Sequence, residues 1–501
     1  MKLPRQARRS GAASTRGERR VAILGAGFSG LCMAVRLAKA GIRSFTIYEK
    51  SDGVGGTWRD NSYPGAGCDI PSHLYSFSFD RRPDWSRHYA LQPEILRYLD
   101  DCVDRFGLRS KIRFGVEIVG ARFDDAEALW HLRTRSGETF TADVLVTGLG
   151  QLNRPSVPEI PGLEQFTGTA FHSARWDHSS DLAGKRVAVI GNGASAVQFV
   201  PRIAPDVARL HLFQRSANWI LPRNDAAYSA IAQRIFRSLP ALEWMHRAAI
   251  YWALETRFLA MQNRTGRWVA PLVERAAMAH LEAQVPDADV RAKLVPDYPL
   301  GCKRVLISDD FYPALARANV EVVTSPIERF VRDGVVTADR RHRPVDTLIF
   351  GTGFESLSFL APLEIEGRHG VRLGDVWRDG AEAYLGTAVA GFPNLFILYG
   401  PNTNLGHNSI VFMVEAQVGW AVRCVEELFR RDAGWLDVRR EAMDAYNRDL
   451  QERMLDTVWM AGCHNWYKTA SGKVTNNWPR FTFRYWLEMR KARFDALAWG
   501  A

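Results

Sequence analysis

The run Val21-Ala22-Ile23-Leu24-Gly25-Ala26-Gly27-Phe28-Ser29-Gly30 joins a short apolar stretch to a glycine-rich turn, and a helical pattern follows over residues 31–40. Strand, turn and helix in this order predict a dinucleotide cradle. Gly25 permits the tight turn, Gly27 lets the backbone approach a pyrophosphate, and Gly30 lets the helix pack against its strand. The pyrophosphate would rest on the N-terminus of that helix.

The same pattern occurs a second time further along the chain. The apolar residues 187–190 lead into Gly191-Asn192-Gly193-Ala194-Ser195-Ala196, and a second helical pattern follows. Glycine-rich turns also occur for structural reasons alone, but the strand before each turn and the helix after it favour two nucleotide sites. Gly191, Gly193 and Ser195 would hold the second pyrophosphate. A chain with two dinucleotides is expected to pass electrons between a flavin and a nicotinamide.

The residues that end the following strands distinguish the two sites. Glu49 ends the strand pattern at 45–49, and a carboxylate there can accept hydrogen bonds from a ribose diol. Arg215 takes the equivalent place after the second cradle, where a guanidinium suits a 2′-phosphate. The first site is therefore predicted to bind FAD and the second NADPH. The alternative for Arg215 is a solvated surface charge.

The sequence predicts an α/β fold with two Rossmann-like dinucleotide-binding domains, the NADPH domain being inserted in the FAD domain. The strand pattern at 143–148 is nearly repeated at 346–353, which suggests that the chain crosses between domains near these points. The expected parts are a disordered basic tail at 1–19, a first FAD-binding part at 20–155, an NADPH-binding domain at 156–344, and a second FAD-binding part with a substrate-pocket segment at 345–501.

A segment of different character lies at about 225–292, where apolar and aromatic residues recur at helical spacing. The favoured interpretation is a helical insert packed on the NADPH domain. The alternative is a surface that makes peripheral contact with a membrane and collects an apolar substrate.

The 501 residues carry a net charge of +10, much of it in the N-terminal tail. No apolar run reaches the roughly 18 residues of a membrane span, and no nucleic-acid-binding module accompanies the basic balance. The cysteines form no C-x-x-C pair and no metal-ligand spacing. This pattern speaks against the disulfide reductases, predicts no metal and favours a reducing, cytoplasmic compartment. The Arg- and Ser-rich tail leaves an organellar transit peptide open.

A further motif, Phe166-x-Gly168-x-x-x-His172-x-x-x-Trp176-Asp177, lies between the cradles. Other motifs are Gly55-Gly56-Thr57-Trp58, Tyr63-Pro64-Gly65 followed by Asp69, Gln92-Pro93-Glu94-Ile95-Leu96 and Lys303-Arg304. Together they resemble the patterns of type I Baeyer–Villiger monooxygenases, which are class B flavoprotein monooxygenases, from about residue 20 to about 490. The run at 148–155 is most similar to the 4-hydroxyacetophenone monooxygenase-like branch. The segment 225–292 matches least.

The resemblance implies that NADPH reduces FAD and that O2 then gives a C4a-peroxyflavin, which converts a small apolar ketone into an ester or lactone. The reacting oxygen must stay anionic, which requires a fixed positive charge in a dry site. By resemblance Arg304 supplies this charge, and Asp69 orients it beside the FAD. Taken singly, Arg304 could be a surface charge and Asp69 a turn cap.

The resemblance also assigns the remaining cofactor contacts. Arg215, Ser216 and Lys303 would clamp the 2′-phosphate of NADPH. The turn at 399–407 would face the flavin ring. Further FAD contacts would come from the following residues: Gly56, Thr57, Trp58 and Gln92.

Two sets of residues have less specific roles. The motif residues Phe166, Gly168, His172, Trp176 and Asp177 would form a hinge that couples the domains. A histidine at 172 could also carry protons or be purely structural. Trp466 and Tyr467 would form a wall of the substrate pocket, or else belong to the core.

Two other functions remain open at this point. A related flavin enzyme could hydroxylate amines or oxidise sulfides instead of ketones, because that reaction uses a protonated, electrophilic oxygen. A nucleotide-binding redox sensor without turnover is the third reading, and Arg304 with Asp69 argues against it.

Overall fold

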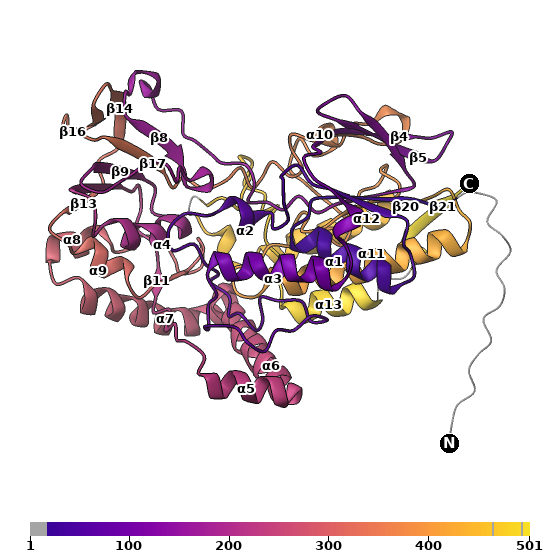
Figure 1. Cartoon of the computed structure of the whole chain (residues 1–501), viewed down its shortest axis with the longest axis horizontal. Coiled ribbons are helices and arrows are strands. Elements are labelled where there is room, and N and C mark those ends of the chain that lie inside the picture. The colour runs from indigo at the N-terminus through magenta and orange to yellow at the C-terminus, as the bar shows by residue number, and fades with distance from the viewer. Residues whose placement is uncertain (1–17, 463–464, 492–493) are drawn as a thin grey trace.

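The computed structural model describes residues 18–462, 465–491 and 494–501, so the tail predicted at 1–19 lies outside the described residues up to position 17. Two parallel sheets organise the chain, with helices on their faces (Figure 1). This arrangement confirms the predicted α/β class.

The first sheet carries the first cradle, in the strand order β19-β7-β1-β2-β3. Its neighbouring strands are parallel throughout. Strands β1 and β7 are buried along their whole length, as expected for apolar central strands with helices on both sides. The elements are β1 (Val21–Leu24), β2 (Phe45–Tyr48), β3 (Ile112–Arg113), β7 (Val144–Thr147), β19 (Leu395–Ile397), and the helices α1 (Phe28–Lys39), α2 (Thr57–Asp60), α3 (Gln92–Arg105) and α11 (Ile410–Arg430).

The second sheet carries the second cradle, in the order β13-β10-β9-β17-β8, again with parallel neighbours. One apolar cluster covers each face of this sheet. The elements are β8 (Thr169–His172), β9 (Arg186–Ile190), β10 (Arg209–Phe213), β13 (Val320–Val323), β17 (Thr347–Phe350), and the helices α4 (Ala194–Ile203) and α9 (Phe311–Leu315).

All strands of the second sheet lie between β7 and β19 in the chain, so the second unit is inserted in the first, as predicted. The return point differs from the expected residue 345. Strand β17 pairs with β8 and β9 and therefore belongs to the second sheet, and the chain leaves that sheet only after residue 350.

The near-repeat in the sequence has a structural cause at the two cradles. Gly25 (φ 98°) and Gly191 (φ 96°) both have left-handed backbones. A Cβ on Gly25 would lie 2.8 Å from the carbonyl oxygen of Gly148, and one on Gly191 would lie 2.5 Å from that of Gly351. In both units a glycine directly follows the strand next to the cradle strand, and its carbonyl lies against the turn. Any side chain at Gly25 or Gly191 would clash with that carbonyl, so only glycine fits there.

Smaller sheets and helices complete the two units. The strands are β4 (Ile118–Asp124), β5 (Leu129–Thr134), β6 (Thr139–Ala142) and β18 (Glu364–Glu366); β11 (Ile220–Leu221) and β12 (Leu306–Ile307); β14 (Ile327–Val331), β15 (Gly334–Thr337) and β16 (His342–Pro344); β20 (Trp435–Val438) and β21 (Leu497–Gly500). The remaining helices outside the insert are α10 (Leu373–Val376), α12 (Arg440–Met454) and α13 (Thr482–Lys491).

The segment predicted at 225–292 is helical, with α5 (Ala230–Ser238), α6 (Pro240–Thr256), α7 (Asn263–Gln284) and α8 (Ala288–Lys293). The expectation that it packs on the second unit holds only for its later part. Leu281 of α7 joins the core of the second unit, whereas Arg247 of α6 bonds to His73 and Ser76 of the first. In the described part of the chain, no helix is both long and apolar enough to cross a bilayer.

Candidate functional site

The first cradle presents free backbone donors to an anion. Helix α1 starts at Gly27, and within the described residues no side chain caps it and no acid lies in its first turn. The Cα of Gly56 lies 3.7 Å from where a Cβ on Gly27 would sit, so two glycine backbones face each other there. These features fit a pyrophosphate on the helix N-terminus.

Glu49 lies directly beside this turn. Its buried carboxylate accepts hydrogen bonds from the backbone N–H groups of Ala26 (2.7 Å) and Ser51 (2.9 Å). The acid is therefore fixed at the end of β2, next to the glycine-rich loop, where a ribose diol would lie.

The predicted contacts at 56–58 and 92 form one connected group. Gly56 (φ 52°) precedes the short helix α2, whose first residues are Thr57 and Trp58. Gln92 donates its side-chain amide to the carbonyl of Trp58, and the Trp58 indole donates to the Tyr75 hydroxyl at 3.2 Å. Gln92 thus holds the backbone of α2 in place, and the Trp58 ring is 9% exposed against Tyr75.

The second cradle repeats the anion-binding arrangement. Helix α4 begins at Gly193, again without a side-chain cap or a first-turn acid among the described residues. A Cβ on Gly193 would meet no atom within 4 Å, so the turn opens to space. Ser195 lies in the first turn of α4, close enough to Tyr63 of the first unit for a hydrogen bond between the side chains.

The three residues predicted to clamp a 2′-phosphate lie near one another in the second unit. The Lys303 ammonium donates to the Ser216 hydroxyl at 2.6 Å and lies 4.3 Å from the centre of the Tyr298 ring. Burial lowers the pKa of Lys303; Asp297 opposes this, and the nearby charge of Arg215 lowers it further. Arg215 itself is exposed at the end of β10. Two cations and a hydroxyl therefore gather where a divalent anion would bind.

Arg304 and Asp69 form an ion pair across the two units. The guanidinium Nε and Nη2 both donate to one carboxylate oxygen of Asp69, at 2.9 and 2.6 Å. Each side chain is 29% exposed, so the pair lines an accessible wall instead of being sealed in the core. Two hydrogen bonds to one carboxylate hold the guanidinium in a single orientation.

The charge state of the pair follows from its surroundings. The Asp69 carboxylate raises the pKa of Arg304 above its already high usual value. Burial alone would raise the pKa of Asp69, but the charge and hydrogen bonds of Arg304 lower it overall, with help from Arg223. The site therefore keeps one fixed positive and one fixed negative charge across the physiological pH range.

Two tyrosines lie near this pair. Tyr467, 1% exposed, and Tyr399 both interact electrostatically with Arg304. Burial raises the pKa of Tyr467 to about 12, so it remains a neutral phenol. The Trp466 ring packs on Tyr467 at 4.6 Å between centroids. Tyr467 is therefore a core residue beside the arginine, which favours the core alternative for it, and only the partly buried Trp466 could form an exposed apolar wall.

Buried polar atoms gather at the turn that was expected to face a flavin. Side-chain atoms of Asn402, Ser409 and Gln417 have no hydrogen-bond partner within the described residues, while the His407 imidazole lies 3.6 Å from the Glu255 carboxylate. Tyr399 donates its hydroxyl to Asn404 at 2.6 Å. The fit to a flavin dinucleotide in the first unit rests instead on the uncapped N-terminus of α1, the facing glycines Gly27 and Gly56, and the fixed Glu49 carboxylate.

The motif between the cradles belongs structurally to the second sheet. Residues 169–172 form β8, and a Cβ on Gly168 would lie 2.3 Å from the carbonyl oxygen of Asp346. Phe166 packs against the apolar core of the second unit, and Trp176 packs between Phe171 and Phe199. Asp177 accepts from the N–H and hydroxyl of Ser179.

His172 is placed as a structural residue. Its Nδ1 accepts the N–H of Ala174 at 3.1 Å. Burial lowers the pKa of His172 to about 4, against an opposing hydrogen bond to Gly353. The ring is therefore neutral at pH 7, which favours the structural reading over the proton carrier.

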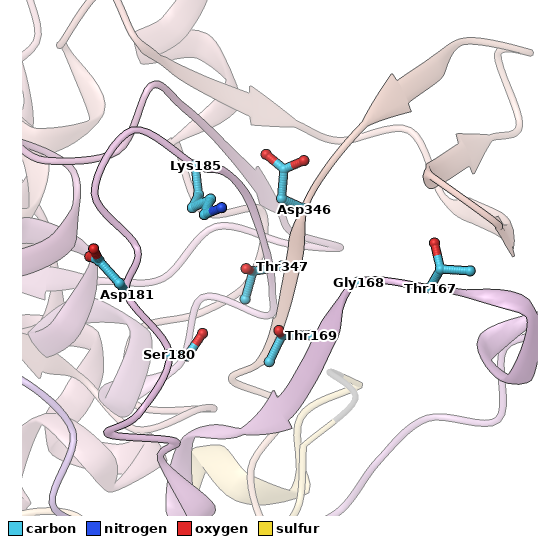
Figure 2. A pocket seen from close by; sticks show the side chains of 8 residues that line it. All are labelled: Thr167, Gly168, Thr169, Ser180, Asp181, Lys185, Asp346 and Thr347. Carbon is cyan, nitrogen blue, oxygen red and sulfur yellow. The ribbon is translucent and has the colours of Figure 1, made fainter.

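Two surface pockets are lined in part by residues of the motif. One, of about 440 Å³, lies at the N-terminal ends of β8 and β17 and is lined by Thr167, Asp346 and Lys185 (Figure 2). Cofactors of open parallel sheets bind at the C-terminal ends of the strands, so this pocket, at the N-terminal ends, is not the cofactor site. Another, of about 500 Å³, is shared by Trp176 and Arg175 with Ser51 and Ser62 of the first unit.

Sequence patterns did not reveal several residues that shape the site. Gln198 of α4 hydrogen-bonds both backbone groups of Gly67 and the Tyr63 hydroxyl. Arg223 donates to the carbonyl of Cys68 at 3.1 Å. A single glutamine or arginine in an ordinary helix or loop carries no periodic signal. Only the placement of Gln198 after the second glycine-rich turn, facing the first unit, could have indicated it.

Comparisons with known proteins agree with this geometry. A model of the flavin-binding monooxygenase-like family matches residues 18–239. A Baeyer–Villiger monooxygenase of Pseudomonas aeruginosa is 46% identical over 96% of this chain and 91% of its own length. A crystal structure of cyclohexanone monooxygenase from Rhodococcus sp. Phi1 bound to NADP+ is 28% identical with a TM-score of 0.87, covering 97% of this chain and 100% of the other. OTEMO in complex with FAD and NADP is 25% identical with a TM-score of 0.85, covering 96% and 99%.

Proposed function

This chain belongs to the Baeyer–Villiger monooxygenases of the flavin-binding monooxygenase-like family, and on that basis we propose that it converts small apolar ketones into esters or lactones with FAD, NADPH and O2. In this proposal FAD would bind in the first cradle and NADPH in the second. When bound, the two cofactors would supply the two electrons that allow one atom of O2 to be inserted beside the carbonyl carbon, while the other atom leaves as water. The observation that carries the proposal is the Arg304–Asp69 pair at the junction of the two units.

The role we assign to Arg304 is to stabilise negative charge in the reaction space. Its raised pKa keeps it charged at every physiological pH, and a fixed guanidinium in a partly dry site is worth more than one in water. Asp69 acts as a positioning residue, because its carboxylate sets the direction of the guanidinium. Oxidation of amines or sulfides needs no such anion stabilisation.

The remaining residues of the site would bind the cofactors and enclose the ketone. Glu49 would accept hydrogen bonds from the ribose hydroxyls of FAD. Arg215, Ser216 and Lys303 would bind the 2′-phosphate of NADPH. Trp466, which packs on the buried Tyr467, would exclude water from the ketone and favour an apolar substrate.

The test is an incubation of the purified holoenzyme with NADPH, 18O2 and a panel of alkyl and aryl ketones, amines and sulfides. Esters or lactones that carry one 18O atom are expected from the ketones. Sulfoxides or N-hydroxyl products without any ester would assign the chain to the other chemistry. Oxidation of NADPH without any oxygenated product would show that the enzyme acts as an NADPH oxidase and not as a monooxygenase.

A further inference from the structure

Helix α6 reverses the usual pattern of a surface helix, because it buries its charged side chains and exposes large apolar ones. Every Glu and Arg in it is buried, namely Glu243, Arg247 and Glu255. Its outer face carries large apolar side chains instead: Leu242 is 41% exposed, Trp244 59%, Met245 58% and Trp252 55%. A surface helix that buries charges and exposes tryptophans requires an explanation, because the exposed apolar area costs free energy in water.

The orientation is fixed by specific polar contacts and is not an accident of loose packing. Glu243 pairs with Arg81 at 2.8 Å. Arg247 donates to the Ser76 hydroxyl and carbonyl at 3.1 and 3.0 Å. Near the other end, Glu255 accepts from the Thr482 hydroxyl at 2.8 Å. Rotating α6 to hide its apolar face would break all of these bonds and leave buried charges unpaired.

Neighbouring elements of the insert extend the same surface. Ile231 is 72% exposed and Ile235 40% on α5, and Trp268 is 72% and Leu272 63% exposed on α7. Helices α5, α6 and α7 lie together along the lower edge of the molecule (Figure 1). We call the outward side chains of these three helices the apolar edge.

The charges on these helices are almost all of one sign. Among residues 230–284, all of which the structure describes, Glu282 is the single exposed acid. The exposed basic residues of the same range are Arg234, Arg237, Arg257, Arg264, Arg267 and Arg275. Arginine beside tryptophan and leucine is the composition that binds the headgroup region of an anionic bilayer.

We propose that the apolar edge docks the enzyme on the surface of an anionic phospholipid membrane. The apolar side chains of α5, α6 and α7 enter the boundary between headgroups and acyl chains, where tryptophan is favoured. The arginines contact lipid phosphates. A second copy of this chain fits less well, because a two-fold contact would bring the same arginines together without acids to pair them.

The edge is connected to the functional site by a short path. The 3-10 segment Arg257–Met261 follows α6 directly. In it, Phe258 packs on His407 at 5.0 Å, and Met261 lies against Gly301 and Gly406. Gly301 is close in sequence to Arg304. Docking would therefore bring the site near a lipid phase in which apolar ketones concentrate, a consequence that rests on the proposed function.

The test is flotation of the full-length holoenzyme with vesicles of pure phosphatidylcholine and with vesicles containing phosphatidylglycerol. Wild-type protein is expected to float with the anionic vesicles and to be released by high salt. Replacing Trp244, Met245 and Trp252 together by serine should lower the partition coefficient at least about tenfold. Replacing Arg264, Arg267 and Arg275 by glutamine should lower it about fivefold per residue.

Matched controls come from exposed residues outside α5, α6 and α7. Val157→Ser with Val371→Ser removes exposed valines elsewhere, and Arg329→Gln with Arg332→Gln and Arg378→Gln removes the same charge. Both controls should float like wild type. Turnover of a water-soluble ketone should be unchanged in every variant, which separates this proposal from the catalytic one.

Two outcomes would overturn the proposal. One is wild-type protein that stays at the bottom of the gradient with both kinds of vesicle. The other is a wild-type dimer that the serine variant converts to a monomer, because the apolar edge would then be covered by a second copy.

Discussion

Arg304 and Asp69 are distant in the chain but act as one group, because the carboxylate determines where the guanidinium points. Both hydrogen bonds go to a single oxygen of Asp69, and both side chains remain partly open to the reaction space. A surface ion pair of this size would contribute little. Here the value of the pair lies in orientation rather than in stability.

Arg304→Ala should separate the two halves of the reaction. We expect ester formation to fall by about 100- to 1000-fold, the usual loss when a charge-stabilising donor is removed. Reduction of the flavin by NADPH should stay close to wild type in stopped-flow absorbance traces. Arg304→Lys keeps the charge but loses the paired donors, so its rate of ester formation should lie between those of wild type and Arg304→Ala. Hydride transfer that is itself blocked would show that the assignment of Arg304 is wrong.

Arg215→Ala should alter the choice of coenzyme. Losing a charged contact to the 2′-phosphate should raise KM for NADPH about 10- to 100-fold and leave KM for NADH nearly unchanged. Steady-state oxidation of both coenzymes measures this, with the exposed Arg378→Ala as the control. Equal changes for both coenzymes would contradict the phosphate clamp.

At this scale the sequence predicted residues that belong to motifs and missed those that do not. The glycines, Glu49, Lys303 and Arg304 carry local patterns with a direct chemical reason. The supporting contacts of Gln198 and Arg223 arise only when distant segments meet. No local periodicity records such a meeting.

At the scale of elements, strand β13 is tied to its neighbours by a group of charges. Glu321 faces His211 across the β10–β13 pair, with 2.8 Å between them. The guanidinium of Arg343 on β16 lies 3.0 Å from the same carboxylate. Burial alone would raise the pKa of Glu321, but Arg343 and His211 lower it to about 2.

Glu321→Gln should therefore cost stability in a pH-dependent way. A carboxylate with a lowered folded-state pKa stabilises the protein above its usual pKa, and this contribution is lost as the pH falls towards 2. We expect the variant to lose about 3 kcal/mol at pH 7 and clearly less at pH 3. Urea unfolding midpoints at both pH values measure the difference, and the exposed Glu328→Gln is the control. A difference that does not change with pH would contradict the assignment.

The sequence indicated which elements form more reliably than how they face. Helical spacing at 225–292 predicted helices, and the structure has them. The spacing could not show that α6 turns its charges inward, because partners such as Ser76, Arg81 and Thr482 are contributed by other parts of the chain. The strand at 347–350 was placed in the wrong unit for a similar reason, since pairing with β8 and β9 decides it.

At the scale of the whole molecule, the two units are held in register by a few polar contacts. Gln198 of α4 bonds to Gly67 and Tyr63 of the first unit. Ser62 of the first unit and His178 of the second lie 2.7 Å apart. The first-unit residues in these contacts, Ser62, Tyr63 and Gly67, come shortly before Asp69 in the chain, so the contacts help to determine how Arg304 meets it.

Gln198→Ala should loosen this alignment without unfolding either unit. We expect the share of NADPH oxidised to hydrogen peroxide instead of ester to rise by about fivefold, the effect of losing a hydrogen bond of ordinary strength. Parallel assays of peroxide and ester measure it, and Gln165→Ala on the exposed surface is the control. An unchanged ratio would mean that Gln198 does not influence the junction.

The insertion of the second sheet also sets an order of events during synthesis on the ribosome. The edge strand β19 (Leu395–Ile397) pairs with β7, which ends at Thr147, so everything between them must be translated first. At about 5–20 residues per second this is a wait of roughly 10–50 s. The inserted unit has all its strands by residue 350 and can close while the outer unit still lacks β19 of its main sheet and helix α11. The nascent chain is therefore expected to mature from the inside outward.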